Sequence, residues 1–141
     1  MANNYRHASF VIPNLTPEEA KFITDWIAAI EDVYDDDTDN TAEPLGFDCQ
    51  IVRDTTMKPC LLITDDGTWC NVVRAADLCQ AFLKAHRPDQ CIGFDYADTC
   101  GTPRVGEFGG GAVFVTAKRA TFMHTSLWLE RKEDIFRKRS V

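Results

Sequence analysis

The chain has 141 residues, of which 45% are hydrophobic and 26% are charged, so its composition is that of a globular protein and excludes an intrinsically disordered one. The length favours a single domain over residues 1–141, because a second hydrophobic core would be too small to be stable. The net charge of -7 disfavours direct binding to nucleic acid, which requires clustered Lys and Arg side chains.

The N-terminal segment is polar where a signal peptide would need a continuous apolar stretch, and no apolar run reaches the length of a membrane span. We therefore expect a cytoplasmic protein with free thiols, since the cytosol is reducing. No two cysteines have the C-x-x-C spacing of structural zinc sites, so the sequence indicates neither a metal nor a cofactor. The six cysteines are Cys49, Cys60, Cys70, Cys79, Cys91 and Cys100.

The first two predicted elements are a strand at residues 8–13 and a helix that begins near residue 16. Thr16 can cap this helix, Pro17 suits its first position, and Glu19 completes a capping box. Apolar residues then recur at helical spacing, so one face of the helix should pack on a sheet. These residues are Ile23, Trp26, Ile27, Ile30 and Val33.

An acidic segment follows at residues 31–43, where no basic residue is present, and the helix should end there in a solvated loop. Asp35, Asp37 and Asp39 alternate as the first ligands of a calcium-binding loop do. Asn40 and Gly46, however, stand where such a loop needs Gly and a bidentate Glu. We interpret the segment as a charged surface that binds no metal.

The rest of the chain predicts strands at residues 47–52, 60–64, 91–96, 112–117 and 121–124. A second helix is expected at residues 71–86 and a third from Thr125 or Ser126. The first six elements match the ferredoxin-like split β-α-β pattern. We therefore expect an α+β fold in which one antiparallel sheet has helices on one face. A C-terminal strand and helix should extend the helix layer or lie over the edge of the sheet.

The connection at residues 99–111 is rich in glycine, and its Arg104 and Glu107 are candidates for a binding surface. The glycine run at residues 109–111 precedes a strand, whereas phosphate-binding loops precede a helix, so we interpret it as structural. Cys100, Asp98 and His124 have the side chains of a thiol nucleophile with its base and orienting group. No local nucleophile motif accompanies them.

Several short segments of the C-terminal half form a recognisable pattern: Ile92-Gly93-Phe94, Thr99-Cys100, Pro103-Arg104, Phe108-Gly109-Gly110-Gly111-Ala112-Val113-Phe114-Val115-Thr116-Ala117 and Thr125-Ser126-x-Trp128-Leu129. This pattern resembles a family of short, uncharacterised bacterial proteins, and similar chains occur on phages and plasmids. The resemblance covers residues 60–130, does not include the acidic segment, and implies no activity.

The leading hypothesis is a non-catalytic protein-binding module, in its sharpest form a mobile-element-encoded, anti-CRISPR-like inhibitor. Its carboxylates would mimic nucleic acid toward the Lys and Arg side chains of a nucleic-acid-handling enzyme. The candidate partner-binding residues are Asp35, Asp36, Asp37, Asp39, Glu43, Arg104 and Glu107.

Two alternatives stay open. One is a small enzyme or ligand-binding protein with a pocket near Cys100, Arg104 and His124. The other is a homo-oligomer of structural role, built by pairing an exposed sheet edge. The basic residues of the last helix are interspersed with acidic ones, so we interpret them as a solvated helix face. Their sign, opposite to that of the acidic segment, would also suit head-to-tail or partner contacts.

Overall fold

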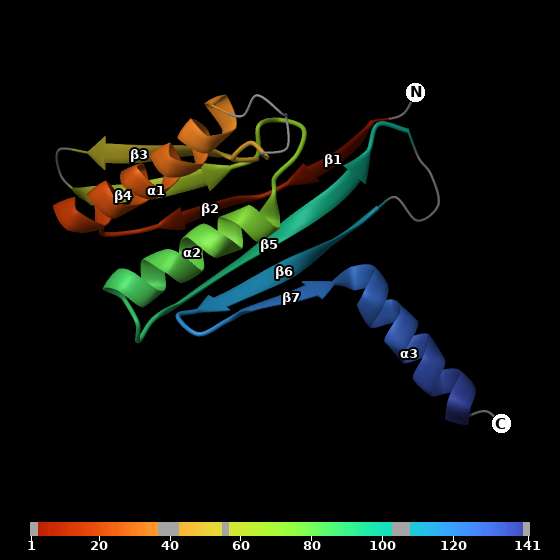
Figure 1. Cartoon of the computed structure of the whole chain (residues 1–141). Helices are drawn as coiled ribbons and strands as arrows, with labels where there is room; N and C mark the ends of the chain where they lie inside the picture. Colours follow the sequence, from red (N-terminus) through yellow and green to blue (C-terminus); the bar gives the residue numbers. More distant parts are fainter. Residues whose placement is uncertain (1–2, 37–42, 55–56, 103–107, 140–141) are drawn as a thin grey trace.

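The computed structural model describes residues 3–36, 43–54, 57–102 and 108–139, and these residues form an α+β fold with antiparallel sheets and three helices. One sheet has the strand order β1-β5-β6-β7 and the other has the order β2-β4-β3 (Figure 1). The strands are β1 (Asn4–His7), β2 (Ser9–Ile12), β3 (Asp48–Asp54), β4 (Met57–Thr64), β5 (Cys91–Cys100), β6 (Gly109–Thr116) and β7 (Ala120–His124).

The first extended segment supplies one strand to each sheet, because it changes partner at Ala8. β1 pairs with β5, whereas β2 pairs with β4. The carboxylate of Asp65 accepts the N–H of Ala8 at 3.1 Å, and the N–H of Asp65 donates to the Ala8 carbonyl at 3.1 Å. Beyond the junction β2 still lies beside β5, since Phe10 stacks on Phe94 with ring centroids 4.1 Å apart. The segment therefore joins the two sheets.

The α+β class, with its C-terminal strand and helix, is confirmed. The split β-α-β order is present as β2, α1 (Pro17–Asp35), β3, β4, α2 (Val72–His86) and β5. The hydrogen bonds, however, divide the expected single sheet into two, because the first strand exchanges its partner. Both expected hairpins form, β3 with β4 and β5 with β6.

The capping box at the start of α1 is present. The N–H of Glu19 donates to the Thr16 hydroxyl at 3.1 Å, and the N–H of Thr16 donates to the Glu19 carboxylate at 2.9 Å. Arg87, at the end of α2, also binds this carboxylate with its Nε at 2.7 Å and one Nη at 3.1 Å. The same Nη donates to the carbonyls of Pro13 and Asn14. One guanidinium therefore fixes the start of α1 to the end of α2.

Helix α2 lies at the centre of the core, and Figure 1 shows it beside α1 and along β5 and β6. Asn71 caps the helix by accepting the N–H of Arg74 at 3.0 Å. The apolar residues of α2 recur at helical spacing, which puts seven of them in the core. These residues are Val72, Ala75, Ala76, Leu78, Cys79, Phe82 and Leu83. Neither α1 nor the third helix contributes as many buried residues.

The glycine run differs from the expectation of a loop. Gly109, Gly110 and Gly111 lie inside β6 and pair with β5, which extends to Cys100. A Cβ at Gly111 would overlap the carbonyl oxygen of Met123 and would lie 2.5 Å from the Tyr96 hydroxyl. Glycine is needed here because the backbone passes directly beneath a ring, not because the chain turns.

The third helix, α3 (Thr125–Arg139), neither lies in the helix layer nor covers a sheet edge. The structure describes all of α3, and no residue of it is buried. Figure 1 shows it projecting away from both sheets after β7. Eight of its fifteen residues are charged, so it lacks the wide apolar stripe with which α2 enters the core.

Candidate functional site

The acidic residues expected to bind a partner lie at or beyond the end of α1. Asp35 and Asp36 are exposed, and the last turn of α1 holds no basic residue, so these carboxylates face the negative end of the helix dipole. Glu43 is also exposed and lies 3.8 Å from Arg74. Four other candidates, Asp37, Asp39, Arg104 and Glu107, lie outside the described residues, as does half of the segment compared with a calcium loop.

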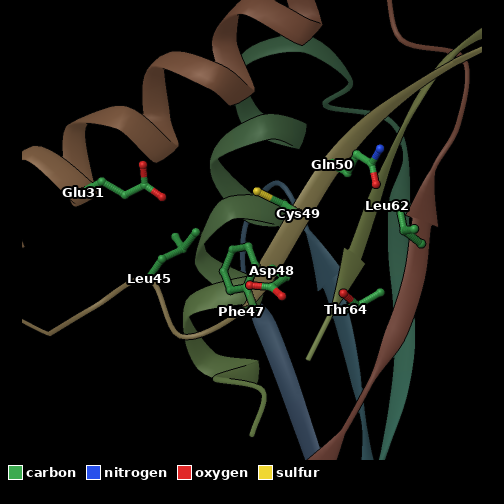
Figure 2. A pocket seen from close by; sticks show the side chains of 8 residues that line it. All are labelled: Glu31, Leu45, Phe47, Asp48, Cys49, Gln50, Leu62 and Thr64. Carbon is green, nitrogen blue, oxygen red and sulfur yellow. The ribbon is translucent and has the colours of Figure 1, made fainter. Parts of the chain in front are cut away.

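Beside this end of α1 an open groove separates the helix from β3. Two cavities, of about 370 Å³ and about 340 Å³, share Glu31, Cys49 and Gln50 and so form one continuous depression. Figure 2 shows Glu31 on α1 facing the Cys49 thiol on β3. We call this depression the α1–β3 groove; its other lining residues are Ile23, Thr24, Ile27, Ala28, Leu45, Phe47, Asp48, Ile51, Leu61, Leu62 and Thr64.

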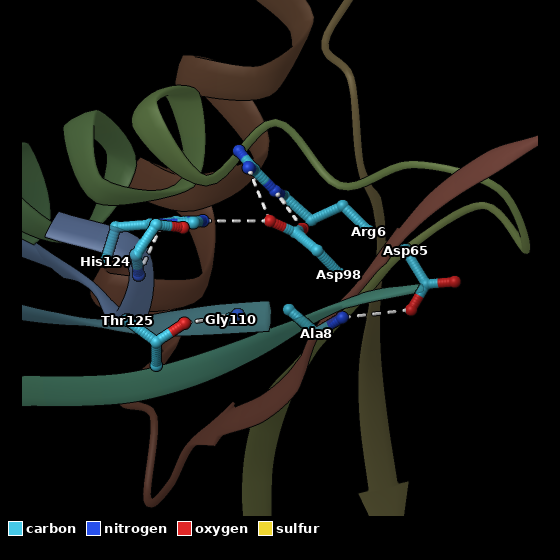
Figure 3. Close-up of polar contacts among 8 residues, drawn as sticks. Arg6, Ala8, Asp65, Asp98, Gly110, His124 and Thr125 are labelled. Atoms are coloured by element: carbon cyan, nitrogen blue, oxygen red, sulfur yellow. Dashed lines mark hydrogen bonds and ion pairs between the residues drawn. The ribbon is translucent and has the colours of Figure 1, made fainter. Parts of the chain in front are cut away.

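Three side chains from distant parts of the chain form a polar network at the other sheet. Asp98 on β5 accepts two hydrogen bonds from Arg6 on β1, at 2.7 Å from Nε and 3.0 Å from Nη2. Its second oxygen lies 3.1 Å from Nε2 of His124 at the end of β7 (Figure 3). The hydrogen bond from Arg6 holds the pKa of Asp98 below its ordinary value, against the opposing effect of burial.

The network also fixes the start of α3. The backbone N–H of Ser126 donates to Nδ1 of His124 at 3.3 Å, so this nitrogen is an acceptor and Nε2 carries the proton toward Asp98. Thr125 adds a second link, because its hydroxyl accepts the N–H of Gly110 at 3.2 Å (Figure 3). His124 thus caps α3 and ties it to β5, while Thr125 ties it to β6.

Arg6 is held between two aromatic rings as well as by Asp98. Its guanidinium carbon lies 4.6 Å from the ring centre of Trp69 and 4.6 Å from that of Tyr96. The hydrogen bond to Asp98 raises the pKa of Arg6, so the network is a permanent ion pair at neutral pH. These contacts position the start of α3 rigidly against the sheet.

A small pocket adjoins the network. Its volume is about 200 Å³, which is below the ~300–1,000 Å³ of typical small-molecule sites. Asp98 and His124 both line it, but Asp98 already bonds to Arg6 and His124. The remaining lining residues are Asn4, Tyr5, Trp69, Thr99 and Phe108.

The predicted thiol constellation is only partly assembled. Asp98 and His124 come together as expected, yet Cys100 makes no hydrogen bond to either of them among the described residues. The hydroxyl of Ser126, 2.9 Å from Nδ1 of His124, stands where a nucleophile would be. Because Arg6 neutralises Asp98, the carboxylate gives the imidazole little of the charge support that a catalytic triad requires.

The surface of α3 combines apolar and basic side chains. Trp128 and Ile135 are seven residues apart and share one face, with Lys132 between them and its ammonium 5.5 Å from the Trp128 ring centre. Five large apolar residues of α3 are about half exposed or more: Leu127 54%, Trp128 54%, Leu129 53%, Ile135 47% and Phe136 73%. The sequence predicted this helix but did not reveal that the fold leaves these side chains uncovered.

Comparisons with protein-family models, with curated proteins and with solved structures found no match. None of the helices in the described part of the chain is long and apolar enough to cross a membrane. The same residues contain no group of three His, Cys, Asp or Glu side chains placed to hold a metal ion.

Proposed function

We propose that the chain is a cytoplasmic, non-catalytic protein-binding module and that α3 is its main contact element. The observation that carries the proposal is a fifteen-residue helix without a buried residue that exposes large apolar side chains. Burying one such side chain is worth about 1.5–3 kcal/mol, whereas an isolated helix of this length is marginal in water. A partner that covers α3 would therefore stabilise it.

The chemistry of α3 indicates the kind of partner surface it fits. Trp128 and Ile135 form the centre of an apolar face, and Lys132 adds a positive charge to the same face. Such a face binds an apolar groove with carboxylates at its rim. The polar network fixes the direction in which this face is presented, because His124 and Thr125 hold the first turn of α3.

The acidic end of α1 supports a second contact of opposite sign. Asp35 and Asp36 are exposed at a helix end that disfavours negative charge, so Lys or Arg side chains of a partner would relieve the repulsion. Together with the resemblance to phage- and plasmid-borne proteins, this surface supports the sharper proposal of an anti-CRISPR-like inhibitor. It would bind a nucleic-acid-handling enzyme in place of nucleic acid.

Capture from the native host with three forms of the chain tests these contacts. The forms are the wild type, the α3 variant Trp128→Ala/Ile135→Ala and the acidic variant Asp35→Asn/Asp36→Asn. The captured protein is then purified and its affinity for each form measured. We expect the α3 variant to weaken binding about tenfold or more, and the acidic variant to slow association most at low salt.

Equal affinity of the wild type and the α3 variant for the purified partner would refute α3 as the contact element. Both variants change only exposed side chains, so the free energy of unfolding should stay within about 0.5 kcal/mol of the wild type. This comparison is the control for folding.

A small-molecule site is the second candidate function, because the Ser126 hydroxyl, His124 and Asp98 are joined by hydrogen bonds beside the small pocket. If the hydrogen bonds to His124 and Asp98 made the Ser126 hydroxyl reactive, a fluorophosphonate would label it, and His124→Ala would abolish the labelling. We expect no labelling above that of the Ser126→Ala variant. Stoichiometric labelling of Ser126 would instead favour an enzyme.

A further inference from the structure

The partner of α3 can be identified from the surface of the chain itself. We propose that α3 of one copy docks into the α1–β3 groove of a second copy. This inference rests on the proposed function and names its partner. It differs from the pairing of sheet edges, since the contact is a helix in a groove and involves no new strand pairing.

A helix cannot reach the groove of its own chain in this fold. β3 is the outer strand of one sheet and β7, which leads directly into α3, is the outer strand of the other. Figure 1 shows α3 at the end of the molecule remote from α1 and β3. Because His124 and Thr125 fix the first turn of α3 to the sheet, the helix can meet such a groove only on another molecule.

The floor of the groove is apolar and matches the face of α3. Ile27 and Ile51 line its inner half and are partly exposed, whereas Ile23 and Leu61, which also line it, are fully buried. The space of about 340 Å³ there is large enough for bulky side chains such as Trp128 and Ile135. Filling it would cover apolar surface on both molecules.

The rim of the groove is acidic. Glu31, on α1, lines both cavities and faces Cys49, whereas the exposed Asp48 lies next to Cys49 on β3 and on the opposite face of that strand. Burial raises the pKa of the Cys49 thiol, and the charges of Glu31 and Asp48 raise it further. A basic side chain entering with an apolar helix face would meet the carboxylate of Glu31, which has the opposite charge.

The charge of α3 is complementary to the rest of the chain. The helix has five basic and three acidic residues, and since the whole chain has a net charge of -7, the remainder has a net charge of -9. Arg137 is paired within the helix with Glu133 and Asp134. Lys132 lies over the ring of Trp128 on the apolar face, where it can reach Glu31 of the second copy.

Two variants of the full chain separate the two halves of the contact. The helix variant, Trp128→Ala/Ile135→Ala, keeps an intact groove. The groove variant, Glu31→Lys/Gln50→Lys, keeps an intact α3 and changes only exposed residues, so the body should remain folded. Glu130→Gln, on the opposite face of α3, is the matched control.

Sedimentation velocity at increasing concentration measures self-association of each chain and of a mixture. We expect the wild type and Glu130→Gln to associate, and each double variant to associate about tenfold or more weakly. A one-to-one mixture of the two double variants should regain a heterodimer, because one intact helix then meets one intact groove. High salt should weaken all of these complexes.

Other outcomes overturn the inference. A groove variant that still associates as the wild type does would show that α3 pairs with α3. A monomeric wild type that binds phosphatidylserine vesicles through α3 would replace the second copy with a membrane. A monomeric wild type whose α3 binds a different captured protein would refute docking onto a second copy but would leave the proposed function standing. Failure of this inference is therefore distinguishable from failure of the proposed function.

Discussion

Gly111 lies where β6 passes beneath Tyr96, and the space there admits no side chain. A Cβ would overlap the backbone oxygen of Met123, which cannot move without breaking the pairing of β6 with β7. We expect Gly111→Ala to lower the free energy of unfolding by about 2–4 kcal/mol, measured by urea denaturation.

Gly93 is the matched control for Gly111, because it lies in the same sheet and a Cβ there would meet no atom at close range. The nearest atom to a Cβ at Gly93 is 3.8 Å away, an ordinary contact. Gly93→Ala should therefore change the free energy of unfolding by less than about 1 kcal/mol. Equal losses for the two variants would contradict the close approach of Tyr96 to β6.

Asp98 makes stability depend on pH in a defined direction. Its pKa is lowered from 3.8 by the hydrogen bond from Arg6, so the ion pair stabilises the fold above the ordinary pKa and is lost as pH falls through the lowered one. We expect Asp98→Asn to cost about 1–2 kcal/mol at pH ~6 and less at pH ~3, by denaturation at both pH values. A constant difference would contradict this origin.

At the scale of elements, Arg87 joins the two core helices. The carboxylate of Glu19 is 7% exposed and its partner guanidinium 15% exposed, so removing the cation leaves a buried charge behind. We expect Arg87→Ala to lower the free energy of unfolding by about 2–4 kcal/mol in urea denaturation. Lys21→Ala removes an ion pair whose side chains are 75% and 62% exposed, and should cost less than about 0.5 kcal/mol.

Elements with local signals could be predicted from the sequence. The capping box at Thr16 and Glu19 predicted the start of α1, and the apolar spacing of α2 predicted a core helix. Both signals are local, because capping hydrogen bonds and helical periodicity involve only residues close together in the sequence. β1 was missed, since its polar residues have no strand pattern and it forms only by pairing with β5. The glycines of β6 were missed for the same reason, since their strand depends on the packing of Tyr96.

The candidate site was predictable only in part. Asp98 and His124 were recognised as a pair by residue type, but Arg6 lies on the missed strand, 92 positions from Asp98. No local pattern reports such a distance in sequence. The acidic residues are exposed as expected where they are described, whereas the uncovered state of α3 depends on where the sheet ends, which no periodicity reveals.

Across the whole molecule, the cysteines should divide by burial. Burial raises the pKa of Cys70 to about 11 and that of Cys79 to about 12, whereas Cys91 is exposed. We expect Ellman's reagent to label Cys91 first in the folded protein, and Cys70 and Cys79 only after unfolding. Rapid labelling of Cys79 under native conditions would contradict a closed core around α2.

The central claim is that α3 adds nothing to the core of its own chain and is ordered by contact with another protein molecule. Hydrogen–deuterium exchange of the amides of α3, compared with those of α2 in free and associated protein, tests it most directly. We expect fast exchange in α3 of the free chain, slow exchange in α2, and marked slowing in α3 on association. An α3 already as protected as α2 in the free chain, or one unchanged on association, would contradict the claim.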